Sequence, residues 1–194
     1  MKPTARTFVA VEMGDAVRER AARLIRALAA SQADIRWIEP HNLHLTLKFL
    51  GEVPFEEIPA VCKAVERAVA GIEPFRLELL GVGAFPNIRR PRTLWLGAGA
   101  GQAEMEALQH AIERGLKKLG YRPEGRKFKT HLTLGRVRRA GPALARLAEL
   151  LAEHASYQAG ASPVEEVTVF ASELTPEGPV YSALSRAQLG ADAG

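Results

Sequence analysis

The chain has 194 residues, with 26 lysines and arginines against 22 aspartates and glutamates and a formal net charge of +4 at pH 7. Its composition, 47% hydrophobic and 25% charged, is that of an ordinary globular protein and disfavours wholesale disorder, collagen-like repeats and coiled coils. A single cysteine, Cys62, excludes an internal disulfide. No apolar run is long enough to span a bilayer, and the first residues do not resemble a secretory signal. We therefore expect a cytoplasmic protein with no membrane partner.

The hydrophobic period along the chain predicts a mixture of strands and helices. Strands are expected over residues 7–13, 35–38, 43–50, 75–82, 93–96, 131–137, 164–174 and 180–184. Helices are expected over residues 17–28, 54–69, 105–119 and 142–154, two of them opened by a proline. Many neighbouring strands are joined by short turns, which favours antiparallel pairing. The predicted fold class is therefore α+β, and a doubly wound parallel sheet is disfavoured.

Basic residues are concentrated in one part of the chain. The stretch 117–139 holds nine lysines and arginines and one acid, Glu124, whereas the residues after Ala140 hold two arginines and seven acids. A basic stretch is commonly just a solvated surface, but this one is local, and the rest of the chain is not equally basic. It indicates a polyanionic partner, with phosphate as the obvious anion.

One tetrapeptide occurs twice. The sequence His-Leu-Thr-Leu stands at 44–47 and again at 131–134, 87 residues further on, each time in a predicted strand that precedes a proline-initiated helix. The repetition predicts two lobes related by a pseudo-twofold axis. No linker separates the copies, so we expect one bilobal domain over residues 1–194 and a monomer, because the duplication already supplies the symmetry.

The repeated motif suits phosphoryl chemistry. Side chains alternate along a strand, so each histidine and its threonine share one face while the leucines point to the core. Two imidazoles in one groove can act as general base and general acid, and two hydroxyls can donate hydrogen bonds to phosphate oxygens. One such motif is commonly structural, but two identical copies favour catalysis. The residues by themselves do not say which histidine is the acid.

The two motifs resemble those of the two-histidine phosphoesterase superfamily, in particular the RNA 2′,3′-cyclic phosphodiesterases, also called 2′-5′ RNA ligases. The similarity extends to the stretches 6–11, 48–51, 85–86 and 91–97, and to Gly135-Arg136. The resemblance implies that each lobe is an antiparallel sheet with helices on its outer face, and that the groove between the lobes carries both motifs. It also implies that His44 is the proton donor, that His131 is the proton acceptor, and that Thr46, Thr133 and Arg136 bind the phosphate.

The implied reaction opens a 2′,3′-cyclic phosphate at an RNA end to a 2′-phosphate, with reversible 2′-5′ ligation through the same transesterification chemistry and tRNA fragments among the RNA partners to consider. We expect neither a metal nor a cofactor. His41, His44 and His131 would be the histidines of a metal site, but His41 lies in an expected turn and no further ligand cluster accompanies them. Two alternatives stay open, a non-catalytic RNA-binding module and a two-histidine enzyme for a small cyclic nucleotide.

Strand alternation leaves two residues of these motifs unresolved. Arg136 is out of step with His131 and would face away from the groove, unless Gly135 ends the strand or forms a bulge. Lys48 is in step with His44 and would either reach substrate or be an ordinary surface lysine.

Trp95 is expected in the core or stacked on a base. Two loops are expected to follow an RNA backbone, one carrying Arg89, Arg90 and Arg92 and the other Arg126, Lys127 and Lys129.

Overall fold

The computed structural model describes residues 3–125, 127–176 and 178–191. Nine strands lie in this part of the chain: β1 (Thr4–Glu12), β2 (Ile35–Trp37), β3 (His44–Pro54), β4 (Phe75–Phe85), β5 (Thr93–Ala98), β6 (His131–Val137), β7 (Gln158–Val164), β8 (Glu166–Thr175) and β9 (Gly178–Gln188). Four α-helices accompany them in the same residues: α1 (Asp15–Ala29), α2 (Ile58–Val69), α3 (Gln102–Lys117) and α4 (Ala143–Glu153). Short 3₁₀ turns, η1 (Pro40–Asn42) and η2 (Phe55–Glu57), precede β3 and α2.

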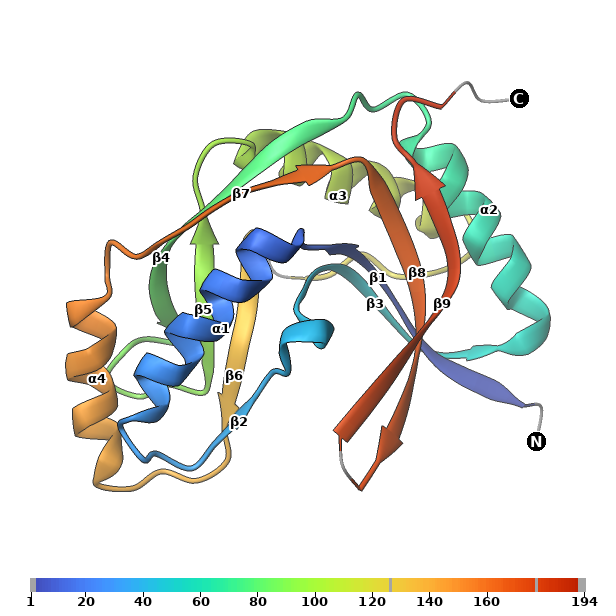
Figure 1. Ribbon diagram of the computed structural model, residues 1–194. Helices are drawn as coiled ribbons and strands as arrows, with labels where there is room; N and C mark the ends of the chain where they lie inside the picture. The colour runs from blue at the N-terminus through green and yellow to red at the C-terminus, as the bar shows by residue number, and fades with distance from the viewer. Residues whose placement is uncertain (1–2, 126, 177, 192–194) are drawn as a thin grey trace.

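The strands form two antiparallel sheets. The first has the order β3-β1-β8-β9 and the second the order β2-β6-β5-β4-β7, with every pair antiparallel. In each sheet a motif strand lies against a central strand, β3 against β1 and β6 against β5, as the two halves of Figure 1 show. The predicted α+β class with two pseudo-symmetric antiparallel lobes is therefore confirmed.

Helices cross between the lobes. α1 follows β1 of the first sheet but packs against β6, β7 and α4 of the second. α3 follows β5 of the second sheet but contacts β3 of the first and lies beside α2. Figure 1 shows α1 and α4 together on one side and α2 on the other. Each lobe is thus completed by a helix that starts in the other lobe. No helix in the described residues is both long and apolar enough to cross a membrane.

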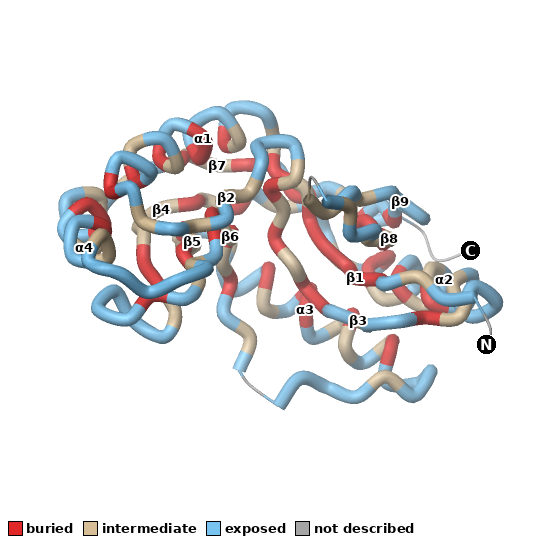
Figure 2. The backbone as a smooth tube through the Cα atoms, turned by 90° about the horizontal axis from the view of Figure 1, so that it is seen from below, coloured by how far each residue is buried: buried red, intermediate tan, exposed pale blue. Residues whose placement is uncertain are grey.

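The main core is continuous across both sheets. Leu45 and Leu47 of β3 and Leu132 and Leu134 of β6 belong to one buried cluster with the inward faces of all four helices. In Figure 2 the buried stretches run through the middle of the molecule, and the outer turns of the helices are exposed. Burying this much apolar surface is the principal term that stabilises the fold.

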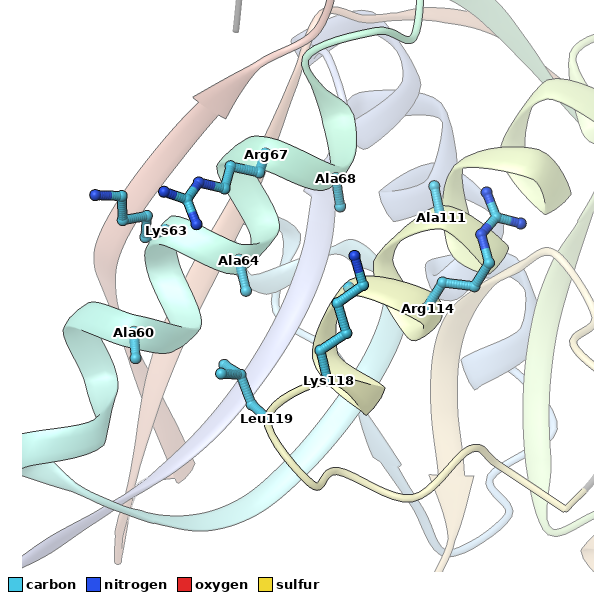
Figure 3. Close-up of a pocket in the computed structure, with 10 residues that line it drawn as sticks. Ala60, Lys63, Ala64, Arg67, Ala68, Ala111, Arg114, Lys118 and Leu119 are labelled. Carbon is cyan, nitrogen blue, oxygen red and sulfur yellow. The ribbon is translucent and has the colours of Figure 1, made fainter. Parts of the chain in front are cut away.

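Helices α2 and α3 approach closely because their contact is made of small residues. A Cβ atom on Gly115 would lie 3.2 Å from both the Ala64 carbonyl oxygen and the Ala68 Cβ. Figure 3 shows the groove that results, with alanines on its floor and Lys63, Arg67, Arg114 and Lys118 around it. None of the predicted site residues lines this groove.

Two details of the strand and helix assignment differ from the sequence prediction. β7 was not expected, because Gln158–Val164 contains Gly160 and Pro163, which are residues typical of turns. It forms because it is an edge strand, where a proline is tolerated, and it pairs with β4. The helix expected from Pro54 begins at Ile58, because β3 continues through Pro54 and the turn η2 intervenes.

A buried ion pair joins β3 to α3 and to the loop that follows α3. Lys48, 3% exposed, donates to the Glu113 carboxylate at 3.0 Å and to the Arg122 carbonyl at 2.8 Å. The same carboxylate accepts the backbone N–H of Glu124 at 2.8 Å. Burial by itself raises the pKa of Glu113, but the Glu124 N–H and the Lys48 ammonium outweigh it and hold that pKa below its usual value. The pair therefore fixes the start of the loop that leads to His131.

Replacing Glu113 with alanine should destabilise the protein by about 3 kcal/mol, because it leaves the Lys48 ammonium buried without a counter-charge. Urea denaturation measures the loss. Glu149→Ala is the matched control, since it breaks an exposed ion pair with Arg146 and should cost less than about 1 kcal/mol. Equal losses in the two variants would contradict the buried pair.

Candidate active site

The structure brings the two copies of the motif together. β3 and β6 belong to different sheets yet contact each other. In both strands the leucines are buried, whereas His44, Thr46, His131 and Thr133 are only partly buried. We call the side of each sheet that carries these histidines and threonines its inner face; the leucines and the helices lie on the opposite side.

Each motif strand contains a β-bulge at the same place. In β3, Thr46 pairs with Ala10 and Lys48 with Val9, so Leu47 is the extra residue. In β6, Thr133 pairs with Trp95 and Gly135 with Leu94, so Leu134 is the extra residue. A bulge moves all following side chains to the other face. The residue that returns to the inner face is therefore Phe49 in the first copy and Arg136 in the second.

The bulge decides on which face of the sheet Lys48 and Arg136 lie, which strand alternation left open. Lys48 lies on the core side and is buried, so both expectations for it, substrate contact and surface lysine, are wrong. Arg136 lies on the inner face, where its charge acts on both His44 and His131. A Cβ atom on Gly135 would lie within 2.9 Å of Trp37 and Ile35 of β2. Glycine is therefore required at this bulge because β2 packs directly on it.

Both histidines are oriented by the same backbone contact. The Nδ1 atom of His44 is 2.7 Å from the Asn42 carbonyl oxygen, and that of His131 is 2.6 Å from the Lys129 carbonyl oxygen. A carbonyl only accepts, so Nδ1 carries the hydrogen and donates it. Nε2 is then the nitrogen left for chemistry on each ring. Within the described residues, the hydroxyls of Thr46 and Thr133 have no hydrogen-bond partner and are free to bind a ligand.

Burial lowers the pKa of both histidines below 6.5. The carbonyl of Asn42 and the charge of Glu12 oppose the shift of the His44 pKa, and Arg136 adds to it. For His131 the Lys129 carbonyl opposes the shift, and the charges of Arg136 and Lys129 add to it. Since a carboxylate acts on His44 and two cations act on His131, the pair is electrostatically unequal.

Aromatic rings surround the two histidines. Phe8, Phe170 and Tyr181 form a small cluster around His44, with ring centroids at 4.9, 6.3 and 5.2 Å from that of His44. Phe85 lies edge-on to His131 at 5.0 Å. These rings exclude water from the imidazoles, which is the physical cause of the lowered pKa values.

Trp95 lies on the inner face and is half-buried. It pairs with Thr133 and contacts Phe85, and the Lys129 ammonium stands 4.4 Å from its ring centre. A Cβ on Gly83 would lie 2.5 Å from this ring, so a glycine is needed beneath it.

Sequence reasoning missed Glu12 and Tyr181. Their signal, a cross-strand register with His44 for Glu12 and a ring contact for Tyr181, exists only in the folded chain.

One of the two basic loops joins β4 to β5, and the other leads into β6. The Asn87 side chain accepts the backbone N–H groups of Arg89 and Arg90, which leaves those two arginines exposed at the tip of the β4–β5 loop. Lys127 is exposed and Lys129 lies beside His131, whereas Arg126 is outside the described residues.

Among the residues that the structure describes, no group of three or more histidine, cysteine, aspartate or glutamate side chains is placed to hold a metal ion.

A comparison with models of known protein families identifies the family of this chain. The model of the LigT-like phosphoesterases matches residues 11–95 and again residues 96–181. The chain belongs to this family. The two matches divide the LigT-like chain into the same two units that the repeated motif predicted, and the resemblance to two-histidine phosphoesterases is confirmed.

Relatives and solved structures agree with the family. The chain is 38% identical to the RNA 2′,3′-cyclic phosphodiesterase of Methanothermobacter thermautotrophicus over 91% of this chain and 95% of the relative. It is 36% identical to the protein of the same name from Archaeoglobus fulgidus, over 92% and 97%. The crystal structure of TT0787 from Thermus thermophilus superimposes with a TM-score of 0.81 at 30% identity, covering 96% of this chain and 99% of that one.

Replacing Arg136 with glutamine should raise the pKa of both His44 and His131 toward 6.5, because it removes a cation that disfavours each imidazolium. The ring signals followed by NMR as a function of pH measure the shift. Arg139→Gln is the control, since Arg139 is exposed beside Asp34 and does not act on either ring. Unchanged pKa values in the Arg136 variant would place its guanidinium away from the histidines.

Proposed function

We propose that this protein is a metal-independent RNA 2′,3′-cyclic phosphodiesterase that opens the cyclic phosphate at an RNA 3′ end to a 2′-phosphomonoester. The observation that carries the proposal is the pairing of two identically built His-x-Thr strands, each presenting a free Nε2 and a free hydroxyl on the inner face. The curated relatives of the same length carry the same name.

In this mechanism His131 is the general base. Its Nε2 takes a proton from water as the water oxygen bonds to phosphorus. Lys129 and Arg136 favour the neutral, basic form of this ring at pH 7. The departing group is the 3′-oxygen, whose bond to phosphorus breaks while the 2′-oxygen keeps the phosphate.

His44 is the general acid that protonates the 3′-oxygen. Its cross-strand partner is Glu12, whereas the partner of His131 is Gly97. Burial and Arg136 favour the neutral form of His44, whereas the Glu12 carboxylate favours its imidazolium form, and a bound phosphate adds to the effect of Glu12. This difference supports the assignment of acid to His44 and base to His131. Thr46, Thr133 and Arg136 bind the non-bridging phosphate oxygens and stabilise the charge that develops on them.

Ligation follows from the same groups. When a 5′-hydroxyl of RNA takes the place of water, the same attack on the cyclic phosphate gives a 2′-5′ linkage, and the 3′-oxygen again receives its proton from His44. Because α1 and α3 each complete the opposite lobe, we further propose that residues 1–194 act as one bilobal unit in both reactions.

Purified protein in excess EDTA should convert an oligoribonucleotide with a 2′,3′-cyclic phosphate end to the 2′-phosphate. His44→Ala and His131→Ala should each lower kcat by about 10²- to 10⁴-fold, the usual contribution of a general acid or base. His110→Ala, on the exposed side of α3, is the control and should keep full activity. Product analysis that resolves 2′- from 3′-phosphates measures the outcome.

Turnover that is indifferent to both substitutions would contradict the mechanism. Binding of the RNA without turnover by the wild-type protein would instead favour a non-catalytic RNA-binding module.

The acid and the base can be told apart with a substrate whose departing 3′-oxygen is replaced by sulfur. A thiolate leaves without a proton, because a thiol is far more acidic than an alcohol. His44→Ala should therefore recover most of its lost rate on the sulfur substrate, whereas His131→Ala should stay slow. Recovery by the His131 variant alone would reverse the two roles.

A further inference from the structure

A cavity of about 700 Å³ lies next to residues that contact His44. It lies between the segment of β2 and η1 and the end of the β8–β9 hairpin. Asn42, whose carbonyl orients His44, and Tyr181, whose ring meets His44 edge-on, both line it. The cavity is therefore next to His44 and shares Asn42 and Tyr181 with its surroundings. Its size is sufficient for one nucleotide.

Cations lie in and beside the cavity. Arg36 of β2, which lines it, pairs in register with Arg136 of β6, so two like charges stand directly opposite each other. Such a pair destabilises a sheet unless an anion lies between the charges. Arg138 is a second cation of the lining, together with the carboxylate of Glu39. Within the described residues no carboxylate is within ion-pair distance of Arg36, Arg136 or Arg138, and Arg136 donates only a long hydrogen bond of 3.5 Å to the Thr93 hydroxyl.

Arg36 reaches across to the opposite lobe. Its Nη2 atom lies 3.3 Å from the position that a Cβ on Gly178 would take, at the end of the hairpin. The charges of Arg136, Arg36 and Arg6 all act on the Tyr181 hydroxyl, where they oppose the rise in its pKa that burial causes. Three guanidinium groups thus act on the Tyr181 phenol, whose ring contacts His44.

We propose that this cavity is a second phosphate subsite, in which Arg36 binds the phosphodiester that joins the terminal nucleotide to its 5′ neighbour. The inference rests on the proposed function and specifies its substrate as a polynucleotide end. Antiparallel partners have Cα atoms roughly 5 Å apart, so Arg136 and Arg36 can serve two successive phosphates, the cyclic phosphate and the next diester. A guanidinium binds a phosphate in bidentate fashion, which suits Arg36 for this role.

Three matched substrates test the subsite. They are a 2′,3′-cyclic mononucleotide, the dinucleotide with the same cyclic end, and that dinucleotide with an uncharged methylphosphonate in place of the linking phosphate. The readout is kcat/KM for each substrate with the wild-type protein, with Arg36→Gln and with the control Arg139→Gln. Arg139 is exposed and does not line the cavity.

The wild-type protein should prefer the charged dinucleotide over the mononucleotide by roughly tenfold or more, as expected for charge-assisted hydrogen bonds to one phosphate. Arg36→Gln should bring this ratio close to one, and Arg139→Gln should preserve it. The methylphosphonate should lose the same preference, and Arg36→Gln should lower its kcat/KM no further, because the interaction is already absent.

The subsite is overturned if the wild-type protein turns over all three substrates equally, or if Arg36→Gln keeps the preference for the charged dinucleotide. It is also overturned if Arg36→Gln slows the charged and uncharged dinucleotides alike. Failure of the proposed function gives a different result, since a folded wild-type protein would then turn over none of the three substrates, and the subsite would fall with it.

Discussion

The site depends on a one-residue bulge in each motif strand. A strand presents its side chains with a period of two, so a regular strand would keep Arg136 away from His131 and Lys48 beside His44. The extra residues, Leu47 and Leu134, reverse this order after the threonine. The bulge therefore places Lys48 in the core, where it anchors the loop before His131, and Arg136 on the inner face, where the proposed mechanism needs it.

The scaffold is nearly symmetric, yet the proposed mechanism needs two unequal histidines. The backbone contacts at Nδ1 are the same on both rings, and so is the position of each bulge. The difference comes from neighbours on the central strands and loops, with Glu12 opposite His44 and Lys129 beside His131. The repeated strands thus supply the geometry of the proposed site, and the charged residues around them make its two histidines unequal.

The lobes differ most where the second sheet has one strand more than the first. β2 has no counterpart next to β3, and it extends the second sheet toward the β8–β9 hairpin. That extension creates the cavity beside His44 and carries Arg36 into it. Gly135 makes the arrangement sterically feasible, because any side chain there would collide with Trp37 and Ile35. The same glycine thus follows the bulge residue Leu134 and lets β2, which builds the cavity, pack on β6.

The sequence by itself determined the motif pair, the fold class and most strands and helices, because hydrophobic period and a repeated tetrapeptide are local properties of the chain. It also identified Gly135 as the position where a bulge would redirect Arg136. It could not place Glu12, Tyr181 or Arg36, which reach the site through cross-strand register and a contact between lobes. It also misplaced Lys48 and omitted β7, since one depends on a bulge and the other on pairing with β4. Only the tertiary structure decided these, because register and burial are set by partners that lie far away along the chain.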